Sequence, residues 1–395
     1  MVRESNLYIL LLVFILLIPS LLSKQIVFFL FLITLALLIL AKSGKFVLSY
    51  DIAKIINPFL IFNLLIISAF ILYYLSGSEV KIYDFFKDVF QFSYPILLLL
   101  IGYFISSKIK FDTFAKFLVY FSLIMSIIYF LYIIFYLGGN ISLISSDKLE
   151  KTSAFPFNGF FQAFSFFLIS SNKVKVNLKR IFQIIFIVAI ILTFSRTAIA
   201  LLVLSFIFSY GLINSLISIT LIITFIFSTF SLSASDSKFL QKISSIPTEL
   251  FLNYGNELSS RSERNQNWRS YEAQRALRQV TDNASIIPSF VGFGAGSLVD
   301  LGYYQSLNGN KFRYINKLHN GFAEIFFKSG IFGILIVIYI FFKLFSIAKN
   351  NSRKQSLYYL TLSLIITTFV IGGIISKGEI SNFILFYSII LNSPN

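Results

Sequence analysis

The amino-acid sequence predicts an all-α, polytopic integral membrane protein with about twelve transmembrane helices and one large external loop. Three observations predict this fold class. The chain of 395 residues is 57% hydrophobic and only 13% charged, and its mean hydropathy of +0.82 is far from that of soluble proteins. Its apolar residues come in long blocks, such as residues 7–22, 181–194 and 331–342, whose backbone in lipid must close its hydrogen bonds within helices. Its basic residues gather on one side of the membrane when those blocks are threaded through it.

The apolar blocks place the helices along the chain, with spans of about 14 to 23 residues accepted because short helices can be buried within a bundle. The expected helices are residues 7–22, 26–41, 56–75, 89–106, 117–137, 156–171, 181–194, 197–213, 215–233, 320–342, 357–375 and 380–393. The first is interpreted as a membrane helix and not as a cleaved signal peptide, because the rest of the chain is equally hydrophobic. The chain then divides into nine helices over residues 1–233, a large loop over residues 234–319 and three helices over residues 320–395.

The charges orient these helices. With the N-terminus in the cytoplasm, fifteen of the 33 Lys and Arg residues lie on the inner side with only three of the 17 Asp and Glu residues. The opposite orientation would place the basic cluster at residues 173–180 outside. Most of the formal net charge of +16 is therefore explained by topology, and nucleic acid is not an expected partner. The large loop then lies outside, and the smaller external loops at residues 76–88 and 138–155 are expected to be ordinary solvated connections.

Residue counts exclude several chemistries. The chain has no cysteine, which removes disulfides, thiol nucleophiles and cysteine-ligated metals, and His319 is its only histidine. Neither a metal ion nor another cofactor is therefore expected.

The large loop contains one segment that is expected to be helical. Residues 258–280 lack Pro and Gly, and their spacing places four arginines and two aromatic rings on one face of an amphipathic helix. The members of this stripe are Arg261, Arg264, Trp268, Tyr271, Arg275 and Arg278. Guanidinium groups suit phosphate oxygens, and aromatic faces suit sugar rings or the membrane interface. The alternative is a solvated helix that rests on the membrane domain through Ala273, Leu277 and Val280, with arginines that contact only lipid headgroups.

Arg196 lies between two apolar segments that leave little room for a loop. A charge at the centre of a membrane helix costs about 2.5–3.5 kcal/mol even on the lower scales, so this side chain is expected to face a water-filled cavity or an anion. The alternative is that it extends to the external headgroups.

A polar group is expected where the large loop enters the tenth helix. His319 and Asn320 are followed one turn later by Glu324 and then by Lys328. Histidine is the side chain best suited to acid–base chemistry near neutral pH, although a lone histidine is often structural. Glu324 and Lys328, at i and i+4, are also spaced to neutralise each other. Before this group, Gly292, Gly294 and Gly296 are interpreted as a tight turn that lets the backbone approach the site, because no βαβ unit surrounds them.

Taken in order, these residues resemble the O-antigen ligase and polymerase superfamily of bacterial membrane glycosyltransferases. The resemblance covers about residues 193–333. It is carried by Ser-Arg-Thr-Ala at residues 195–198, Arg264 before Trp268, the glycines at 292, 294 and 296, His-Asn-Gly-Phe at residues 319–322 and Gly-Ile-Phe-Gly at residues 330–333. The spacing from Trp268 to Gly292 leaves Arg261 as a rival to Arg264.

The resemblance implies a GT-C-like enzyme of the bacterial inner membrane, with both termini cytoplasmic and its active site periplasmic. It implies a metal-independent, inverting transfer from an undecaprenyl-diphosphate-linked glycan donor to a glycan or lipid A-core acceptor, in contact with membrane lipid. Flippase and chain-length regulator proteins are implied partners. The implied catalytic residues are His319, Arg196 and Arg264, and the implied substrate-binding residues are Arg261, Trp268, Tyr271, Arg275, Arg278, Asn320 and Glu324.

The sequence favours a polymerase of O-antigen or another surface polysaccharide, because its abundance of Phe, Ile, Lys, Asn and Ser indicates AT-rich coding of the sort often found in polysaccharide gene clusters. The first alternative is an O-antigen ligase that transfers finished polymer to lipid A-core. A flippase or transporter of lipid-linked oligosaccharides is a further alternative, although the off-centre loop and the lack of internal repeats speak against it. A structural membrane scaffold is the last.

Overall fold

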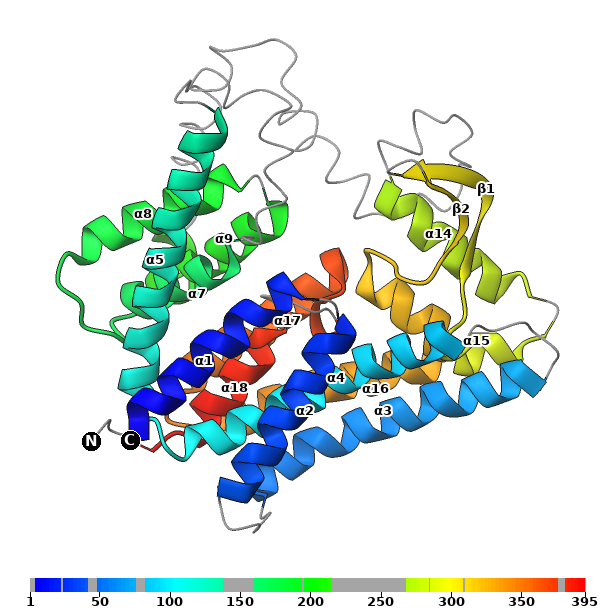
Figure 1. Ribbon diagram of the computed structural model, residues 1–395, viewed down its shortest axis with the longest axis horizontal. Coiled ribbons are helices and arrows are strands. Elements are labelled where there is room, and N and C mark those ends of the chain that lie inside the picture. Colours follow the sequence, from blue (N-terminus) through cyan, green and yellow to red (C-terminus); the bar gives the residue numbers. More distant parts are fainter. Residues whose placement is uncertain are drawn as a thin grey trace. The chain divides into compact units, whose positions relative to one another are not determined.

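The computed structural model describes residues 4–22, 24–41, 48–75, 82–137, 159–193, 195–214, 268–283, 285–307, 310–375 and 381–394, and these are mostly helical (Figure 1). The expected helix at residues 215–233 and two arginines of the predicted stripe, Arg261 and Arg264, lie outside the described residues.

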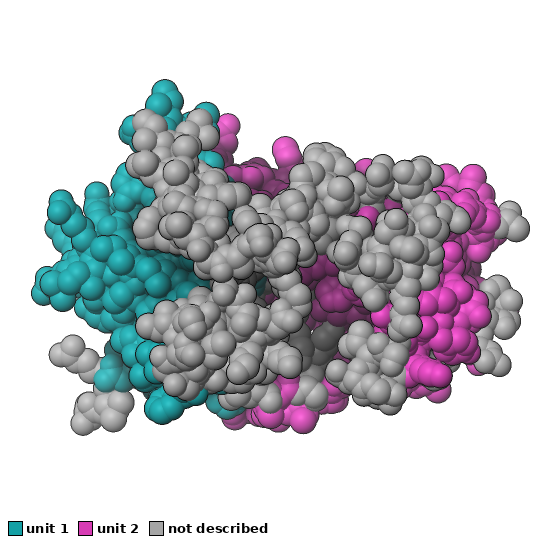
Figure 2. Space-filling model, turned by 90° about the horizontal axis from the view of Figure 1, so that it is seen from above, with its two compact units in different colours: residues 1–21, 107–246, 393–395 teal, residues 22–106, 247–392 magenta. Residues whose placement is uncertain are grey.

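The chain forms two units, which Figure 2 shows in different colours and which are described here one at a time. The first unit comprises residues 1–21, 107–246 and 393–395. Its described helices are α1 (Glu4–Leu21), α5 (Phe111–Leu137), α7 (Phe160–Ser170), α8 (Lys179–Leu192) and α9 (Arg196–Tyr210). Helix α7 is buried along its whole length because α5, α8 and α9 all pack against it.

The second unit comprises residues 22–106 and 247–392. Its first elements are α2 (Lys24–Ala41), α3 (Tyr50–Leu75), α4 (Ile82–Ser106), α14 (Trp268–Thr281) and α15 (Ile287–Val291). Strands β1 (Val299–Leu307) and β2 (Asn310–Ile315), α16 (Gly321–Lys349), α17 (Lys354–Ile371), the short 3-10 helix η3 (Gly373–Ile375) and α18 (Asn382–Asn392) follow. Helix α4 packs against α2, α3 and α18, and α16 packs against α3, α14, α15 and α17.

Several helices are long and apolar enough to cross a membrane, so the chain is a multi-pass membrane protein. Among the described residues these are Tyr50–Leu75, Ile82–Ser106, Phe111–Phe135, Gly321–Lys349 and Lys354–Ile371. Shorter apolar helices occupy the expected positions of the first, second, sixth, eighth and twelfth spans. The count of twelve spans stays a prediction.

The all-α prediction omitted a β-hairpin. Strands β1 and β2 pair antiparallel within the large loop, with Val299 opposite Ile315 and Leu307 opposite Asn310. The omission was avoidable, because Asn308 and Gly309 form the Asn-Gly pair that most strongly marks a two-residue hairpin turn. In Figure 1 the hairpin lies beside α14, and β1 contacts that helix.

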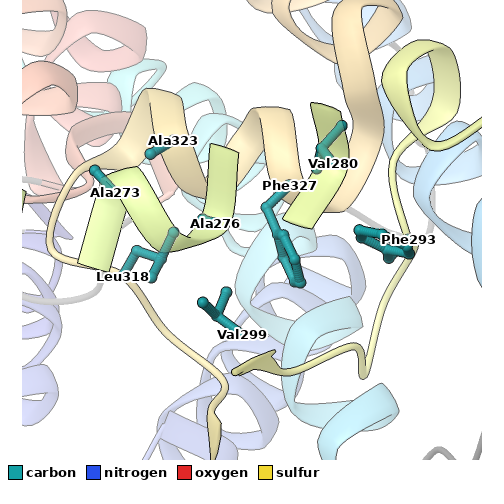
Figure 3. Close-up of a cluster of buried hydrophobic side chains, with 8 residues drawn as sticks. All are labelled: Ala273, Ala276, Val280, Phe293, Val299, Leu318, Ala323 and Phe327. Atoms are coloured by element: carbon teal, nitrogen blue, oxygen red, sulfur yellow. The ribbon is translucent and has the colours of Figure 1, made fainter. Parts of the chain in front are cut away.

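Helix α14 joins the loop to the start of α16. The helix was expected over residues 258–280; its described part begins at Trp268 and ends at Thr281. Its small apolar side chains enter a buried cluster with residues from the hairpin and α16 (Figure 3). The members of this cluster are Ala273, Ala276, Val280, Phe293, Val299, Leu318, Ala323 and Phe327. Ala273 and Val280 therefore rest on the helical bundle as the alternative interpretation requires, while Ala276 occupies the central place that was expected for Leu277.

The glycine-rich segment after α15 is the expected tight turn. Gly292, Gly294 and Gly296 have φ values of 73°, 79° and 81°, which favour glycine because other residues have a Cβ that clashes there. The turn fits against a kink in α16, where Gly330 has non-helical dihedrals of φ 60° and ψ −160°.

The kink explains why the turn binds at this place. A break at Gly330 removes the helical partners of the carbonyl groups one turn earlier. Two backbone N–H groups of the turn replace them: Phe293 donates to the carbonyl of Phe327, and Gly294 donates to that of Lys328, each at 2.9 Å. Ala295 donates to the carbonyl of Ile66 in α3 at 3.3 Å, so the turn connects two helices.

We expect Gly294→Ala to destabilise the protein strongly, because the new Cβ would lie 2.0 Å from the backbone nitrogen of Phe70. Gly211→Ala is the matched control, since Gly211 has nearly the same φ of 78° but no described atom within 4 Å of its Cβ position. Both variants place a side chain at positive φ, which costs about 1–3 kcal/mol, and only Gly294→Ala adds the clash. Thermal unfolding in detergent measures the difference, and equal losses would contradict this account of the turn.

Candidate functional site

A polar site lies where the large loop enters α16, entirely within the second unit. It is built by three segments far apart in the sequence: the N-terminal turns of α4, helix α14, and residues 316–328. The last two segments were predicted to contribute to the site from their residue types. No residue of α4 was predicted to contribute.

His319 is held by a buried carboxylate. Its backbone N–H donates to Oε2 of Glu272 at 3.2 Å, and its ring Nδ1 lies 2.7 Å from the same oxygen. The Glu272 side chain is 3% exposed, whereas that of His319 is 51% exposed. One half of the imidazole is therefore fixed from inside the protein and the other half is accessible.

The sequence analysis missed Glu272, although a signal for it exists. On a helical wheel Glu272 lies beside Ala276 and Val280, at the edge of the face that packs into the core. A single acidic residue on the apolar face of an amphipathic helix is costly to bury without a partner. The predicted arginine stripe lies on the neighbouring face of the same helix.

Asn320 begins α16. Its backbone is extended, with φ −94° and ψ 114°, and its Oδ1 accepts a hydrogen bond from the backbone N–H of Ala323 at 3.0 Å. This is the N-cap role for which asparagine is among the best residues. The side chain expected to bind substrate is thus occupied in fixing the helix start, immediately after His319.

The expected pairing of Glu324 with Lys328 is wrong. Lys328 forms a buried ion pair with Asp88 of α4, with Nζ and Oδ2 2.7 Å apart, and it also donates to the carbonyl of Ser297. Glu324 instead accepts a hydrogen bond from Gln91 of α4 at 2.8 Å. Both residues of α16 face α4, and Glu324, which was expected to bind substrate, is buried there.

Helix α4 supplies the partners because it begins earlier than expected. The span was placed at residues 89–106 and the preceding residues in a solvated connection, but the helix begins at Ile82. Asp84, Asp88 and Gln91 then share one face at spacings of four and three. Asp84 accepts a hydrogen bond from Asn316 at 3.2 Å, and Asp88 accepts one from the backbone of Gly296 at 2.7 Å.

Two members of the predicted stripe hold the hairpin. The hydroxyl of Tyr271 donates to the carbonyl of Leu301, and its ring lies between those of Trp268 and Tyr303, at centroid distances of 6.2 and 5.7 Å. Arg275 donates from Nε to the carbonyl of Asp300 at 3.0 Å. Tyr271 is buried, so its ring is a packing surface for the hairpin and not an open platform for a sugar.

The approach of Arg275 depends on a glycine. Gly302 has a φ of 78°, and a Cβ there would lie 3.1 Å from Nη2 of Arg275, closer than almost all Cβ contacts. The other two stripe residues in the described part, Trp268 and Arg278, are partly exposed on the first and last turns of α14.

The hairpin itself is closed by an ion pair. Arg313 of β2 contacts both carboxylate oxygens of Asp300, each at 2.7 Å. These hydrogen bonds, together with the nearby charges of Arg313 and Arg275, hold the pKa of Asp300 below its usual value. The pair is partly exposed to solvent, with Arg313 37% and Asp300 21% exposed, so its contribution to stability is modest and it mainly orients the strand.

Arg196 lies in the first unit, at the first position of α9. Ser195 precedes it as the N-cap, with its Oγ accepting a hydrogen bond from the backbone N–H of Ala198 at 3.3 Å. The serine of the predicted motif therefore starts the helix, and the arginine follows as a partly exposed side chain. A cation at a helix N-terminus adds to the positive end of the helix dipole, an arrangement that favours a nearby anion.

Comparison with protein families supports the resemblance. Residues 181–338 match a family model described as O-antigen ligase. Over this stretch, which is less than half of the chain, the sequence is similar to the O-antigen ligase and polymerase superfamily. The match includes Arg196, the large loop, His319 and most of α16, and it supports a ligase or polymerase type of function for this membrane protein. No curated protein matches the chain.

We expect Lys328→Met to be much more destabilising than the double variant Asp88→Asn, Lys328→Met. The single variant leaves the Asp88 carboxylate buried without its cation, which costs about 3–5 kcal/mol in comparable pairs. The double variant removes both charges and keeps an acceptor for Gly296. Thermal unfolding of the purified variants in detergent tests this, and a double variant no more stable than the single one would show that charge pairing is not the reason for burial.

Proposed function

We propose that the protein is a polymerase of O-antigen or another surface polysaccharide, which joins undecaprenyl-diphosphate-linked repeat units at the periplasmic face of the inner membrane. The family match supports this class of reaction. The observation that carries the assignment of the site is that the single histidine of the chain is half exposed, and anchored on its other side, at one end of a membrane-length helix.

Helix α16 also supports the proposed orientation of the protein in the membrane. Its 29 residues, in two parts that meet at Gly330, are long and apolar enough to cross the bilayer. His319 lies at one end, and a basic group follows at the other, with Lys343, Lys349, Arg353 and Lys354. By the positive-inside rule we propose that the basic end of α16 lies in the cytoplasm and His319 in the periplasm, with both chain termini cytoplasmic.

The proposed reaction is a displacement at the anomeric carbon of the donor. A hydroxyl of the acceptor glycan attacks that carbon, the new carbon–oxygen bond forms with inversion, and the bond to the diphosphate breaks. The lipid diphosphate leaves with the electron pair. His319 accepts the proton of the attacking hydroxyl and later releases it to water.

Cationic side chains then stabilise the leaving group. Arg196 and Arg264, helped by Arg261, bind the diphosphate and offset the charge that develops on it as the bond breaks. Trp268 and Arg278, both partly exposed, are proposed to contact the sugar and the phosphate. Tyr271 and Arg275 act through the hairpin, and Asn320 and Glu324 act through the start of α16. No metal ion or nucleotide sugar takes part in the proposed reaction.

The two candidate functions, polymerase and ligase, differ in the acceptor of the glycan. The description of the matched model favours an O-antigen ligase, in which lipid A-core is the acceptor. The composition of the chain favours the polymerase, whose acceptor is a second lipid-linked glycan. In either case a flippase delivers the donor, and a polymerase also works with a chain-length regulator.

We expect His319→Ala and Arg196→Ala, correctly inserted, to fail to complement a deletion strain for surface polysaccharide. Loss of the general base is expected to lower turnover about 10²-fold to 10⁴-fold. Arg196→Lys is expected to fail as well, because a lysine cannot make a forked contact with phosphate, whereas an arginine that contacts only headgroups would tolerate the change. Lys311→Ala, at an exposed position of β2, is the control that should complement.

The glycan profile of the same strains separates the functions. Loss of a polymerase leaves one repeat unit on the core, and loss of a ligase leaves none. Purified protein should lengthen lipid-linked glycan in detergent. Full complementation by His319→Ala, or movement of lipid-linked glycan across liposomes without new glycosidic bonds, would contradict the proposal.

A further inference from the structure

We propose that Glu272 is the positioning residue of His319, and that it holds the imidazole in the tautomer that carries its hydrogen on Nδ1. This proposal rests on the proposed function of His319 as a general base. It assigns the choice of the reactive ring nitrogen to a carboxylate 47 residues earlier in the chain.

One oxygen of Glu272 contacts the backbone and the ring of the same residue. Its Oε2 lies 3.2 Å from the backbone nitrogen of His319 and 2.7 Å from Nδ1. Two contacts to one residue restrict both the position of the backbone and the rotation of the imidazole. Asn320 adds a third restraint, because its N-cap bond fixes the chain directly after the histidine.

The chemistry of a carboxylate selects the tautomer. An ionised carboxylate can only accept hydrogen bonds, so the ring nitrogen beside it must donate. Nδ1 of His319 therefore carries the hydrogen, and the lone pair of the neutral ring lies on Nε2. Since the His319 side chain is half exposed while Glu272 is buried, Nε2 is the nitrogen left to receive the proton of a sugar hydroxyl.

Burial of Glu272 makes this restraint effective. The residue next to it, Ala273, lies in the buried cluster between α14 and the start of α16, so the backbone that carries the carboxylate is held by the core. A side chain that is 3% exposed meets little competition from water for its hydrogen bonds. When His319 accepts a proton, the adjacent carboxylate also stabilises the positive ring that forms, as the buried aspartate does in the serine protease triad.

A purely structural role for Glu272 makes different predictions. In that case the carboxylate would only anchor the chain through the backbone N–H of His319. Glu272→Gln separates the two roles, because its amide oxygen can still accept that hydrogen bond with nearly the same shape. What the amide loses is the negative charge, so its oxygen favours a hydrogen on Nδ1 less strongly and stabilises the protonated ring less.

The first test reads the tautomer directly. His319 is the only histidine, so protein labelled with ring-¹⁵N histidine gives the signal of one imidazole. In detergent, at a pH where the ring is neutral, we expect the wild-type nitrogen shifts of an Nδ1–H tautomer. Glu272→Gln should move the population toward Nε2–H. Gln279→Ala, which removes the α14 side-chain oxygen that accepts from the backbone N–H of Asp300, should not. A wild-type ring with its hydrogen on Nε2 would overturn the proposal, even if no variant folds.

The second test measures turnover with lipid-linked substrate. Glu272→Gln should lower kcat by about 10²-fold to 10⁴-fold with little change in KM, because the reactive nitrogen is blocked while the substrate contacts remain. Glu272→Asp should recover part of kcat, since it restores a carboxylate. Wild-type kcat in Glu272→Gln, or an unchanged tautomer in that variant, would overturn the positioning role.

These outcomes separate this inference from the proposed function. If His319→Ala retains full activity, the general-base role fails, whatever the tautomer of the wild-type ring. If His319→Ala is inactive but Glu272→Gln is fully active, His319 keeps its role and only the positioning by Glu272 is refuted.

Discussion

The buried ion pair of Asp88 and Lys328 is the constraint on which the rest of the site depends. Its two charges are almost completely excluded from solvent, where an unpaired charge is strongly destabilising, so α4 and α16 must keep their register. The same atoms hold the glycine turn, because Asp88 accepts from the backbone of Gly296 and Lys328 donates to that of Ser297. With the turn in place, Phe293 joins the cluster that seats α14, and α14 carries Glu272 to His319.

Local signals predicted much of this arrangement. Composition and apolar blocks located the long helices, and the glycine spacing located the turn, because each depends on neighbours in the sequence. The partners of the charged residues could not be found in this way. Helical spacing offered Glu324 as one possible partner of Lys328, whereas its actual partner, Asp88, lies 240 residues away. The same holds for Glu272 and His319, and the hairpin was missed although its Asn-Gly pair was readable.

For the arginine stripe, helical periodicity predicted which side chains share a face of α14. It could not predict which other segment covers that face. The hairpin covers part of it, so Tyr271 and Arg275 are engaged with strand β1 while Trp268 and Arg278 remain partly exposed. The described part of the loop thus packs on the start of α16. Its aromatic and basic residues are divided between those that form this packing and those that are partly exposed.

The break at Gly330 affects how the protein can adapt to bilayers of different thickness. Because the dihedrals of that residue are not helical, the first nine residues of α16 and the long part that follows need not share one axis. The part before Gly330 is attached to the glycine turn and to α14, and the part after it presents exposed apolar side chains such as Leu335 and Phe342. A bilayer of different thickness changes the tilt of a spanning helix. Such a tilt can be taken up at the joint, which leaves the distance between His319 and its carboxylate independent of lipid length.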